Sequence, residues 1–435
     1  MFGSLASAAV TSPWLRGQRR RWFEANRRRK GRPHEVVYFH QIDDPYSALT
    51  AQTLAAFVGR YDVRLTTHMV PPPEDWAAPE RALLDDYGRR DAAAIAPAYG
   101  LSFSATARPA ADQIAWAQAI LCSANVDGRF VEAVGEISDA LWSGRDLSAA
   151  AARFGEADQA TVDGALKTGA DLRRRAGHYL GATFLHAGEW YWGVDRLDYL
   201  EARLSSLGAD RSPLGTPPIA TRPELQFVPV ETRPANAPPL ELFLSLRSPY
   251  SWLAIERARA LTDHYGIRLI LRPLLPMVMR GLPVPLAKQL YIARDCKREA
   301  ERLGLPFGRI CDPLGAPVER GLAVLAGARR SGRDTDFAAS FLKGVFVEAI
   351  NAGSDRGLKH LCARAGIDWP EAQGWMVDEQ WRDAAEVNRR AMFDLSLWGV
   401  PSFRFGATSA WGQDRIGLIE QSIIQSLNLN TGNLA

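Results

Sequence analysis

The sequence predicts an α/β fold of two tandem domains, each opened by a strand–helix–strand unit and each containing a long helical insertion. The same order of strand, turn, helix and strand signals occurs in both halves of the 435-residue chain. Eight prolines in residues 211–239 separate the halves and are incompatible with a continuous helix or a central strand. A content of 47% hydrophobic and 23% charged residues is typical of globular proteins.

The first half begins with a β-rich run over residues 36–40, then a polar turn from Asp43 and a helical pattern that ends near Phe57. A second strand is predicted over residues 63–67. Because a strand–helix–strand unit needs a right-handed crossover, the two strands are expected to be parallel. The half closes with a short strand at Phe184 and the sequence Trp192-Gly193-Val194-Asp195-Arg196-Leu197.

The second half repeats this order. Strands are predicted at 242–244 and 267–272, and the helix between them ends near Tyr265. Spaced apolar residues predict an insertion with helices at 286–303, 321–330, 336–349, 357–365 and 371–384. The half closes with Trp411-Gly412-Gln413-Asp414-Arg415-Ile416, eight residues after Phe403, as Trp192 follows Phe184. We expect an arm at 1–33, domains at 34–210 and 240–430, and a linker at 211–239.

The N-terminal arm carries most of the positive charge. Residues 16–32 hold nine Lys or Arg and one Glu, a net +8, which leaves −5 on the remainder of a chain whose net charge is +3. Arginine clusters on both sides of Trp22 and Phe23 would suit nucleic acid or an anionic membrane surface. The preferred interpretation is a solvated, partly frayed arm without such a partner.

Composition also bears on location. The apolar runs are shorter than the roughly 18 to 20 residues that cross a bilayer. The apolar stretch 5–10 precedes the arginines, the reverse of a secretory signal, so export is not expected. The four cysteines, at positions 122, 296, 311 and 362, have neither C-x-x-C nor zinc-ligand spacing, which predicts no metal site and a reducing, cytoplasmic location.

Three motifs of the second half carry a family resemblance: Ser248-Pro249-Tyr250-Ser251-Trp252-Leu253-Ala254, Gly399-Val400-Pro401-Ser402-Phe403 and Trp411-Gly412-Gln413-Asp414-Arg415. They resemble those of the 2-hydroxychromene-2-carboxylate isomerase and kappa-class glutathione transferase family, over residues 240 to about 427. The resemblance implies a thioredoxin fold with a DsbA-like helical insertion and glutathione as cofactor. The first half resembles a degenerate copy, which gives two tandem thioredoxin-like domains. Family members pair as homodimers, which implies an intrachain pseudo-dimer or a homodimer.

Ser248 is the candidate catalytic residue. Ser followed by Pro is an N-cap with proline at the first helical position, so a helix should begin at Pro249. A helix N-terminus stabilises an anion placed beside it. The resemblance implies that this anion is the glutathione thiolate and that the Ser248 hydroxyl donates to its sulfur, lowering a thiol pKa that is otherwise about 8.5. The alternative is that Ser248 only caps the helix.

The resemblance also implies the cofactor-binding residues. A cis Val400–Pro401 bond would let the Val400 backbone pair with the cysteinyl unit, and Asp414, with Gln413 beside it, would bind the γ-glutamyl ammonium. Lys288 matches a family lysine, whereas the asparagine common after the second strand is missing. The alternatives are an ordinary trans proline and a helix-capping Asp414.

The first half departs from this pattern. Asp44 stands in the position of Ser248 and Ala182 in that of Pro401, while Asp195 persists. A carboxylate beside a thiolate raises the thiol pKa. We therefore expect one glutathione site per chain, in the second half.

The predicted function is that of a glutathione-dependent isomerase or transferase that adds the thiolate to a small aromatic or conjugated substrate. One alternative is thiol–disulfide oxidoreduction, although Ser248-Pro249-Tyr250-Ser251 stands where such an enzyme has cysteines. The other is a non-catalytic thioredoxin-fold binding or scaffold protein.

Overall fold

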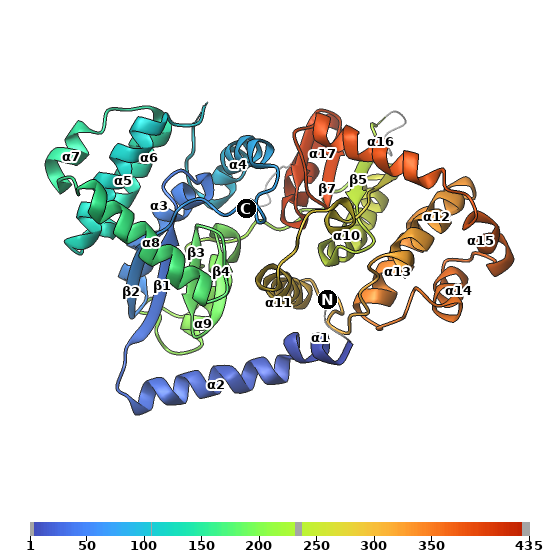
Figure 1. Cartoon of the computed structure of the whole chain (residues 1–435), viewed down its shortest axis with the longest axis horizontal. Coiled ribbons are helices and arrows are strands. Elements are labelled where there is room, and N and C mark those ends of the chain that lie inside the picture. The colour runs from blue at the N-terminus through green and yellow to red at the C-terminus, as the bar shows by residue number, and fades with distance from the viewer. Residues whose placement is uncertain (1–3, 106, 231–236, 429–435) are drawn as a thin grey trace. The chain divides into compact units, whose positions relative to one another are not determined.

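The computed structural model describes residues 4–105, 107–230 and 237–428 (Figure 1). Pro234 of the expected linker and the last two residues of the expected second domain lie outside this part of the chain. The chain divides into two compact units, here called unit 1 (Met1–Arg16 and Glu224–Ala435) and unit 2 (Gly17–Pro223). The finer domain boundaries expected from the sequence remain a proposal.

Unit 2 is built on a four-stranded sheet of order β2-β1-β3-β4, with strands β1 (His34–His40), β2 (Val63–Met69), β3 (Thr183–His186) and β4 (Glu189–Trp192). β1 and β2 are parallel, as the crossover predicts, and β3 is antiparallel to both of its neighbours. Its helices are α3 (Pro45–Arg60), α4 (Arg81–Ile95), η1 (Ala96–Tyr99), α5 (Ala111–Val126), α6 (Phe130–Ser143), α7 (Ser148–Phe154), α8 (Gln159–Arg175), η2 (Val194–Arg196) and α9 (Leu197–Ser205).

Unit 1 has the same topology, β6-β5-β7-β8, with strands β5 (Leu240–Leu244), β6 (Leu269–Pro273), β7 (Ser402–Phe405) and β8 (Thr408–Trp411). β5 and β6 are parallel and β7 is antiparallel to both β5 and β8. Its helices are α10 (Pro249–Tyr265), η3 (Met277–Arg280), α11 (Leu286–Arg302), α12 (Ala316–Arg330), α13 (Asp334–Phe346), α14 (Asp355–Arg364), α15 (Trp369–Trp375), α16 (Trp381–Asp394), η4 (Gln413–Arg415) and α17 (Ile416–Ser426).

Both units therefore have the expected thioredoxin-like sheet with a helical insertion between the second and third strands. Figure 1 shows α12 to α15 gathered into a lobe beside the sheet of unit 1. One continuous core joins this lobe to the sheet, since Phe337 and Phe341 of α13 are buried in the same cluster as Leu242 of β5 and Phe403 of β7. One detail of the prediction is wrong: residues 371–384 are not a single helix, because α15 ends at Trp375 and α16 begins at Trp381.

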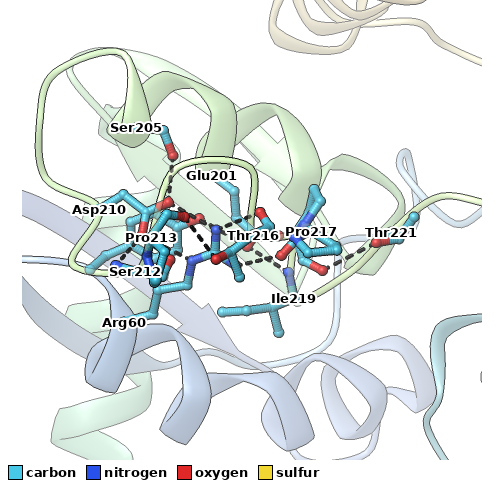
Figure 2. A network of polar contacts seen from close by, with 12 residues as sticks. Arg60, Glu201, Ser205, Asp210, Ser212, Pro213, Thr216, Pro217, Ile219 and Thr221 are labelled. Carbon is cyan, nitrogen blue, oxygen red and sulfur yellow. Dashed lines mark hydrogen bonds and ion pairs between the residues drawn. The ribbon is translucent and has the colours of Figure 1, made fainter.

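The proline-rich segment contains no helix or strand from residue 211 to residue 230. In unit 2 it is held by side chains of α3 and α9 (Figure 2). The Arg60 guanidinium pairs with Asp210 and donates to the carbonyls of Thr216 and Pro217, at 3.1 and 2.5 Å. Glu201 accepts the Ile219 N–H at 2.8 Å. The carboxylate and guanidinium thus satisfy backbone groups that proline leaves without a ladder partner.

Unit 1 holds its own part of this segment in a matching way. Glu420 of α17 accepts the N–H groups of Gln226 and Phe227, both at 2.7 Å, and the Tyr265 hydroxyl at 3.0 Å. In unit 2 the corresponding carboxylate, Glu201, accepts the hydroxyl of Tyr61 at 3.1 Å. Two units that repeat the same carboxylate–tyrosine contact are what a tandem duplication predicts.

The described part of the N-terminal arm is helical, so the fraying in our preferred interpretation is wrong, whereas the expected absence of a partner stays a prediction. The arm forms α1 (Ser4–Val10) and α2 (Pro13–Arg29). In unit 1 the Thr11 hydroxyl donates to the Gly308 carbonyl at 3.1 Å. In unit 2 the Arg20 guanidinium binds the Glu189 carboxylate through two hydrogen bonds of 2.5 and 2.7 Å. The partners that hold the arm lie far along the chain. A local charge pattern carries no information about such partners, so the prediction missed them.

Within the described residues no helix has the length and apolar character that a membrane crossing requires.

Candidate functional site

The candidate site lies at one edge of the sheet of unit 1. Leu244 at the end of β5 pairs with Pro273 of the parallel β6, and Phe243 pairs with Ser402 at the start of the antiparallel β7. Residues that follow β5 and residues that precede β7 therefore meet at this edge. Trp411, the last residue of β8, also pairs with Ser402. The register thus brings five of the six predicted site residues to one place: Ser248, Val400, Pro401, Gln413 and Asp414.

Ser248 begins α10, as predicted. Its backbone is extended (φ −93°, ψ 115°), its Oγ accepts the Ser251 N–H at 3.3 Å, and Pro249 is the first helical residue. The side chain is half-buried. A serine hydroxyl that accepts a hydrogen bond still has its own proton to donate. Capping by Ser248 is therefore compatible with donation to a ligand sulfur, and the two roles are not alternatives.

The Val400–Pro401 peptide bond is cis, as the resemblance implies. The Pro401 carbonyl accepts the Gly412 N–H at 2.9 Å, and the Ser402 hydroxyl donates to the Gly399 carbonyl at 2.7 Å. Both flanking residues are thus tied to the fold. The N–H and C=O of Val400 form no hydrogen bond within the described residues, so they are available to an extended peptide.

Gln413 is buried and its side chain acts inside the protein. Its Oε1 accepts from the Arg257 guanidinium at 2.7 Å, and its Nε2 donates to Glu299 at 2.8 Å and to Oδ1 of Asp414 at 2.6 Å. Both amide protons are used. Gln413 therefore orients the half-buried Asp414 carboxylate, and its own amide N–H groups are not left for a ligand.

Lys288 lies beside Trp398, which in turn lies beside Trp411 at the site. Its Nζ lies 5.9 Å from the centroid of the Trp398 ring, and that ring lies 5.2 Å from the ring of Trp411. A Cβ at Gly399 would lie 2.3 Å from Nε1 of Trp411, so only glycine lets the indole approach this closely. Burial lowers the pKa of Lys288 to about 8. The ammonium forms no ion pair within the described part of the chain.

Two polar contacts next to the site have no counterpart in the sequence-based prediction. The Arg247 guanidinium binds the Asp312 carboxylate at 2.8 and 2.9 Å, and the Tyr250 hydroxyl donates to Asp295 at 2.8 Å. The first contact holds the turn before α10, and the second ties the first turn of α10 to α11. The pairs are 65 and 45 residues apart in sequence, so a single sequence offers no signal that joins them.

In unit 2 the groups at the equivalent position contact one another. Asp44 caps α3, with Oδ2 accepting the Ser47 N–H at 3.0 Å and the Ser47 hydroxyl at 2.8 Å. Burial raises the pKa of Asp44 to about 6. Gly181 replaces Val400, and a Cβ there would lie 2.7 Å from Cβ of Gln41 and 3.3 Å from Oδ2 of Asp44. The Ala182 carbonyl accepts the Gly193 N–H at 2.7 Å, the contact that Pro401 makes in unit 1.

The four cysteines are free thiols and none lies in the Ser248–Ser251 turn. Cys122, Cys296 and Cys362 are buried, and burial raises the pKa of the half-buried Cys311. Among the described residues, no group of three or more His, Cys, Asp or Glu side chains could hold a metal ion.

Comparison with known proteins agrees with this fold. Residues 239–423 match the family model of the DsbA-like thioredoxin domain. Proteins with this domain include isomerases and oxidoreductases. No curated protein sequence matches the chain.

Three solved structures illustrate the similarity. A 2-hydroxychromene-2-carboxylate isomerase is 18% identical, with 44% of this chain and 99% of that chain covered and a TM-score of 0.38. A probable DsbA oxidoreductase from Streptomyces coelicolor is 18% identical, with 46% and 93% covered and a TM-score of 0.35. The cytosolic disulfide reductase DsbM from Pseudomonas aeruginosa with GSH is 17% identical, with 43% and 97% covered and a TM-score of 0.34.

Proposed function

We propose that unit 1 binds glutathione and uses its thiolate as a nucleophile toward a small conjugated or aromatic electrophile. The observation that carries the proposal is the meeting of three groups at one sheet edge: the α10 N-terminus at Ser248, the unpaired Val400 backbone and the Asp414 carboxylate. Each suits a different part of one ligand, namely an anionic sulfur, an extended peptide backbone and a primary ammonium.

The thiolate is stabilised by the start of α10. A helix N-terminus carries about half a positive elementary charge and unpaired N–H groups, and the Ser248 hydroxyl adds a donor. No cationic side chain is required for this. A thiol pKa falls by one to several units in such surroundings, which makes the thiolate abundant at neutral pH.

The reaction that follows is an addition. The sulfur lone pair forms a C–S bond to one end of a conjugated double bond, and the π electrons move to the electron-withdrawing group at the other end. The former double bond is then single and can rotate. Elimination of the thiolate restores the double bond in the new geometry and gives an isomerase, whereas protonation of the adduct gives a transferase. The two outcomes differ only in the fate of the adduct.

Thiol–disulfide oxidoreduction is the weaker candidate because the turn that begins α10 has serines at 248 and 251. A non-catalytic binding role is distinguished by affinity: retention on immobilised glutathione supports the enzyme proposal, whereas retention on heparin alone supports a scaffold.

Asp414→Asn tests the proposal directly. Removing the carboxylate charge while keeping its shape is expected to weaken glutathione binding about 10- to 100-fold, the effect of losing one charge-assisted hydrogen bond. Titration calorimetry of the full chain should give one site in the wild type. Asp195→Asn, the same change at the matching position of unit 2, is the control and should leave the affinity unchanged. Two equivalent sites, or equal effects of both variants, would refute the proposal.

Lys288 predicts a pH dependence of binding. Its pKa of about 8 means that the ammonium is charged below pH 8 and neutral above it. S-methylglutathione is the suitable probe because it has no thiol to titrate. If Lys288 binds a glutathione carboxylate, the affinity for this probe should fall as the pH rises from 7 to 9, by at most about tenfold per pH unit. Lys288→Arg stays charged and should abolish this step. An unchanged step in Lys288→Arg would assign it to another group.

A further inference from the structure

From Gly17 onward, helix α2 packs on unit 2 through one face. On that inner face Arg20 binds the Glu189 carboxylate, which is almost fully buried, and Phe23 lies against the β3–β4 turn, 3.3 Å from where a Cβ at Gly188 would stand. Gly188 has φ +75° and so suits this tight turn. These contacts fix the rotation of this part of α2 about its axis and determine which of its residues are exposed. Figure 1 shows α2 as one continuous helix.

The outward residues form a single stripe, here called the outer face of α2. Its members follow the i, i+3, i+4, i+7 spacing of one helix face: Trp14, Leu15, Gln18, Arg21, Trp22, Ala25, Arg28 and Arg29. Trp14 is 66% exposed, Trp22 is 63% and Leu15 is 42%. Large apolar side chains so exposed on one face indicate an interaction surface rather than scattered surface residues.

The charge of this surface has one sign. From Pro13 to Pro33 every exposed charged residue is basic: Arg21, Arg28, Arg29, Lys30 and Arg32. The one acidic residue of α2, Glu24, is half-buried between Arg27 and Arg28, which hold its pKa at about 2. It is an anion paired within the helix and does not offset the charge of the outer face. The charge of the outer face is therefore complementary to that of an anionic partner.

We propose that the outer face of α2 binds the surface of an anionic lipid bilayer. Tryptophan rings are favoured at the headgroup level and arginines pair with lipid phosphates and carboxylates, so a helix with both on one face lies in the plane of the interface. The apolar and basic residues are ordered along α2, with Trp14 and Leu15 at its start and Arg28 and Arg29 at its end. A nucleic acid backbone is charged along its length and offers no apolar layer to the leucine and tryptophan at the start of the helix.

The inference goes beyond the proposed function, because no residue of the outer face belongs to the candidate site. It is tested by sedimentation of the full chain with phosphatidylcholine–phosphatidylserine vesicles and with phosphatidylcholine vesicles. We expect binding to the first alone, weakened by salt because the charges are exposed. The triple variant Arg21→Gln, Arg28→Gln, Arg29→Gln should lose about fivefold in affinity per charge removed.

A matched control removes three cations from another exposed helix surface. Lys167→Gln, Arg174→Gln and Arg175→Gln make the same change on α8 and should leave vesicle binding nearly unchanged. The double variant Trp14→Ala, Trp22→Ala keeps every charge and should weaken binding at high salt more than at low salt, because it removes only the apolar part. Circular dichroism and thermal unfolding of each variant, which should match the wild type, report that the fold is intact.

Three results would overturn the proposal. The first is wild-type protein that sediments with neither vesicle, and the second is an equal loss of affinity in the α2 and α8 triple variants. The third is a chain that binds single-stranded or duplex oligonucleotides through Arg21, Arg28 and Arg29 while leaving vesicles unbound. This last result would assign the outer face of α2 to nucleic acid.

Discussion

Replacing Ser248 with aspartate is expected to raise the thiol pKa of bound glutathione and to lower its thiolate fraction at pH 7, roughly tenfold for each unit by which the pKa rises. An aspartate can accept the same backbone N–H that Ser248 accepts, as Asp44 does at the start of α3. The helix cap is therefore kept, while a donor to sulfur is exchanged for a negative charge.

The comparison with alanine separates the two roles of Ser248. Ser248→Ala removes the cap, at a cost of about 0.5 to 2 kcal/mol in stability, and removes the donor without adding charge. The order of thiol pKa values, followed by ultraviolet thiolate absorbance against pH, should be wild type, then alanine, then aspartate. Identical titrations in all three proteins would leave Ser248 with a capping role alone.

Unit 2 offers the reverse substitution as a control. Asp44→Ser restores the serine cap there, yet Gly181 and Ala182 still occupy the positions of Val400 and Pro401. We expect no second glutathione site in this variant, because the peptide-binding backbone would still be missing. The effect of Ser248→Asp should be measured at pH 7 and above, well above the ordinary pKa of an aspartate, so that the introduced side chain is charged.

The parts of the fold that can be predicted are those with local causes. The strand–helix–strand openings follow from β-rich runs, and the helix start at Pro249 is as expected from the serine before the proline. The break between α15 and α16 is an exception, because its cause is local and the prediction still missed it: Asp378 accepts the Gln380 N–H at 2.8 Å and forms a turn there. Apolar spacing alone carries no trace of that turn, and so predicts one continuous helix.

The parts that cannot be predicted depend on partners distant in sequence. Nine basic residues among the seventeen of the segment 16–32 predict a solvated arm from local sequence alone. In the structure, Arg20 of the arm binds Glu189 and Thr11 binds the Gly308 carbonyl. The local motif around Trp411 is enough to single out Asp414. That the Gln413 side chain hydrogen-bonds to Arg257 and Glu299 can be known only from the folded structure. A family resemblance can imply a role for a motif. It does not tell which side chains of the motif form hydrogen bonds within the protein and which can contact a ligand.

Breaking the Arg247–Asp312 pair should have the largest effect on stability of any single change near the site. The two side chains are 8% and 11% exposed and form two hydrogen bonds. Asp312→Ala would leave a largely buried guanidinium without this carboxylate, which costs about 3 to 5 kcal/mol when a buried pair loses one partner. Because Arg247 directly precedes Ser248, glutathione affinity should fall as well.

The matched control is an exposed pair in unit 2. Arg145 and Asp139 are 61% and 62% exposed, so Asp139→Ala should change stability by no more than about 1 kcal/mol. Hydrogen exchange resolved by segment is the appropriate measurement, since two units need not unfold together. The double variant Arg247→Met, Asp312→Leu removes both charges and should recover most of the stability but not the glutathione affinity, because the turn before α10 would lose its two hydrogen bonds while its packing remains. Equal exchange in Asp312→Ala and Asp139→Ala would mean that the pair does not hold the turn, and that Ser248 is positioned by its own helix alone.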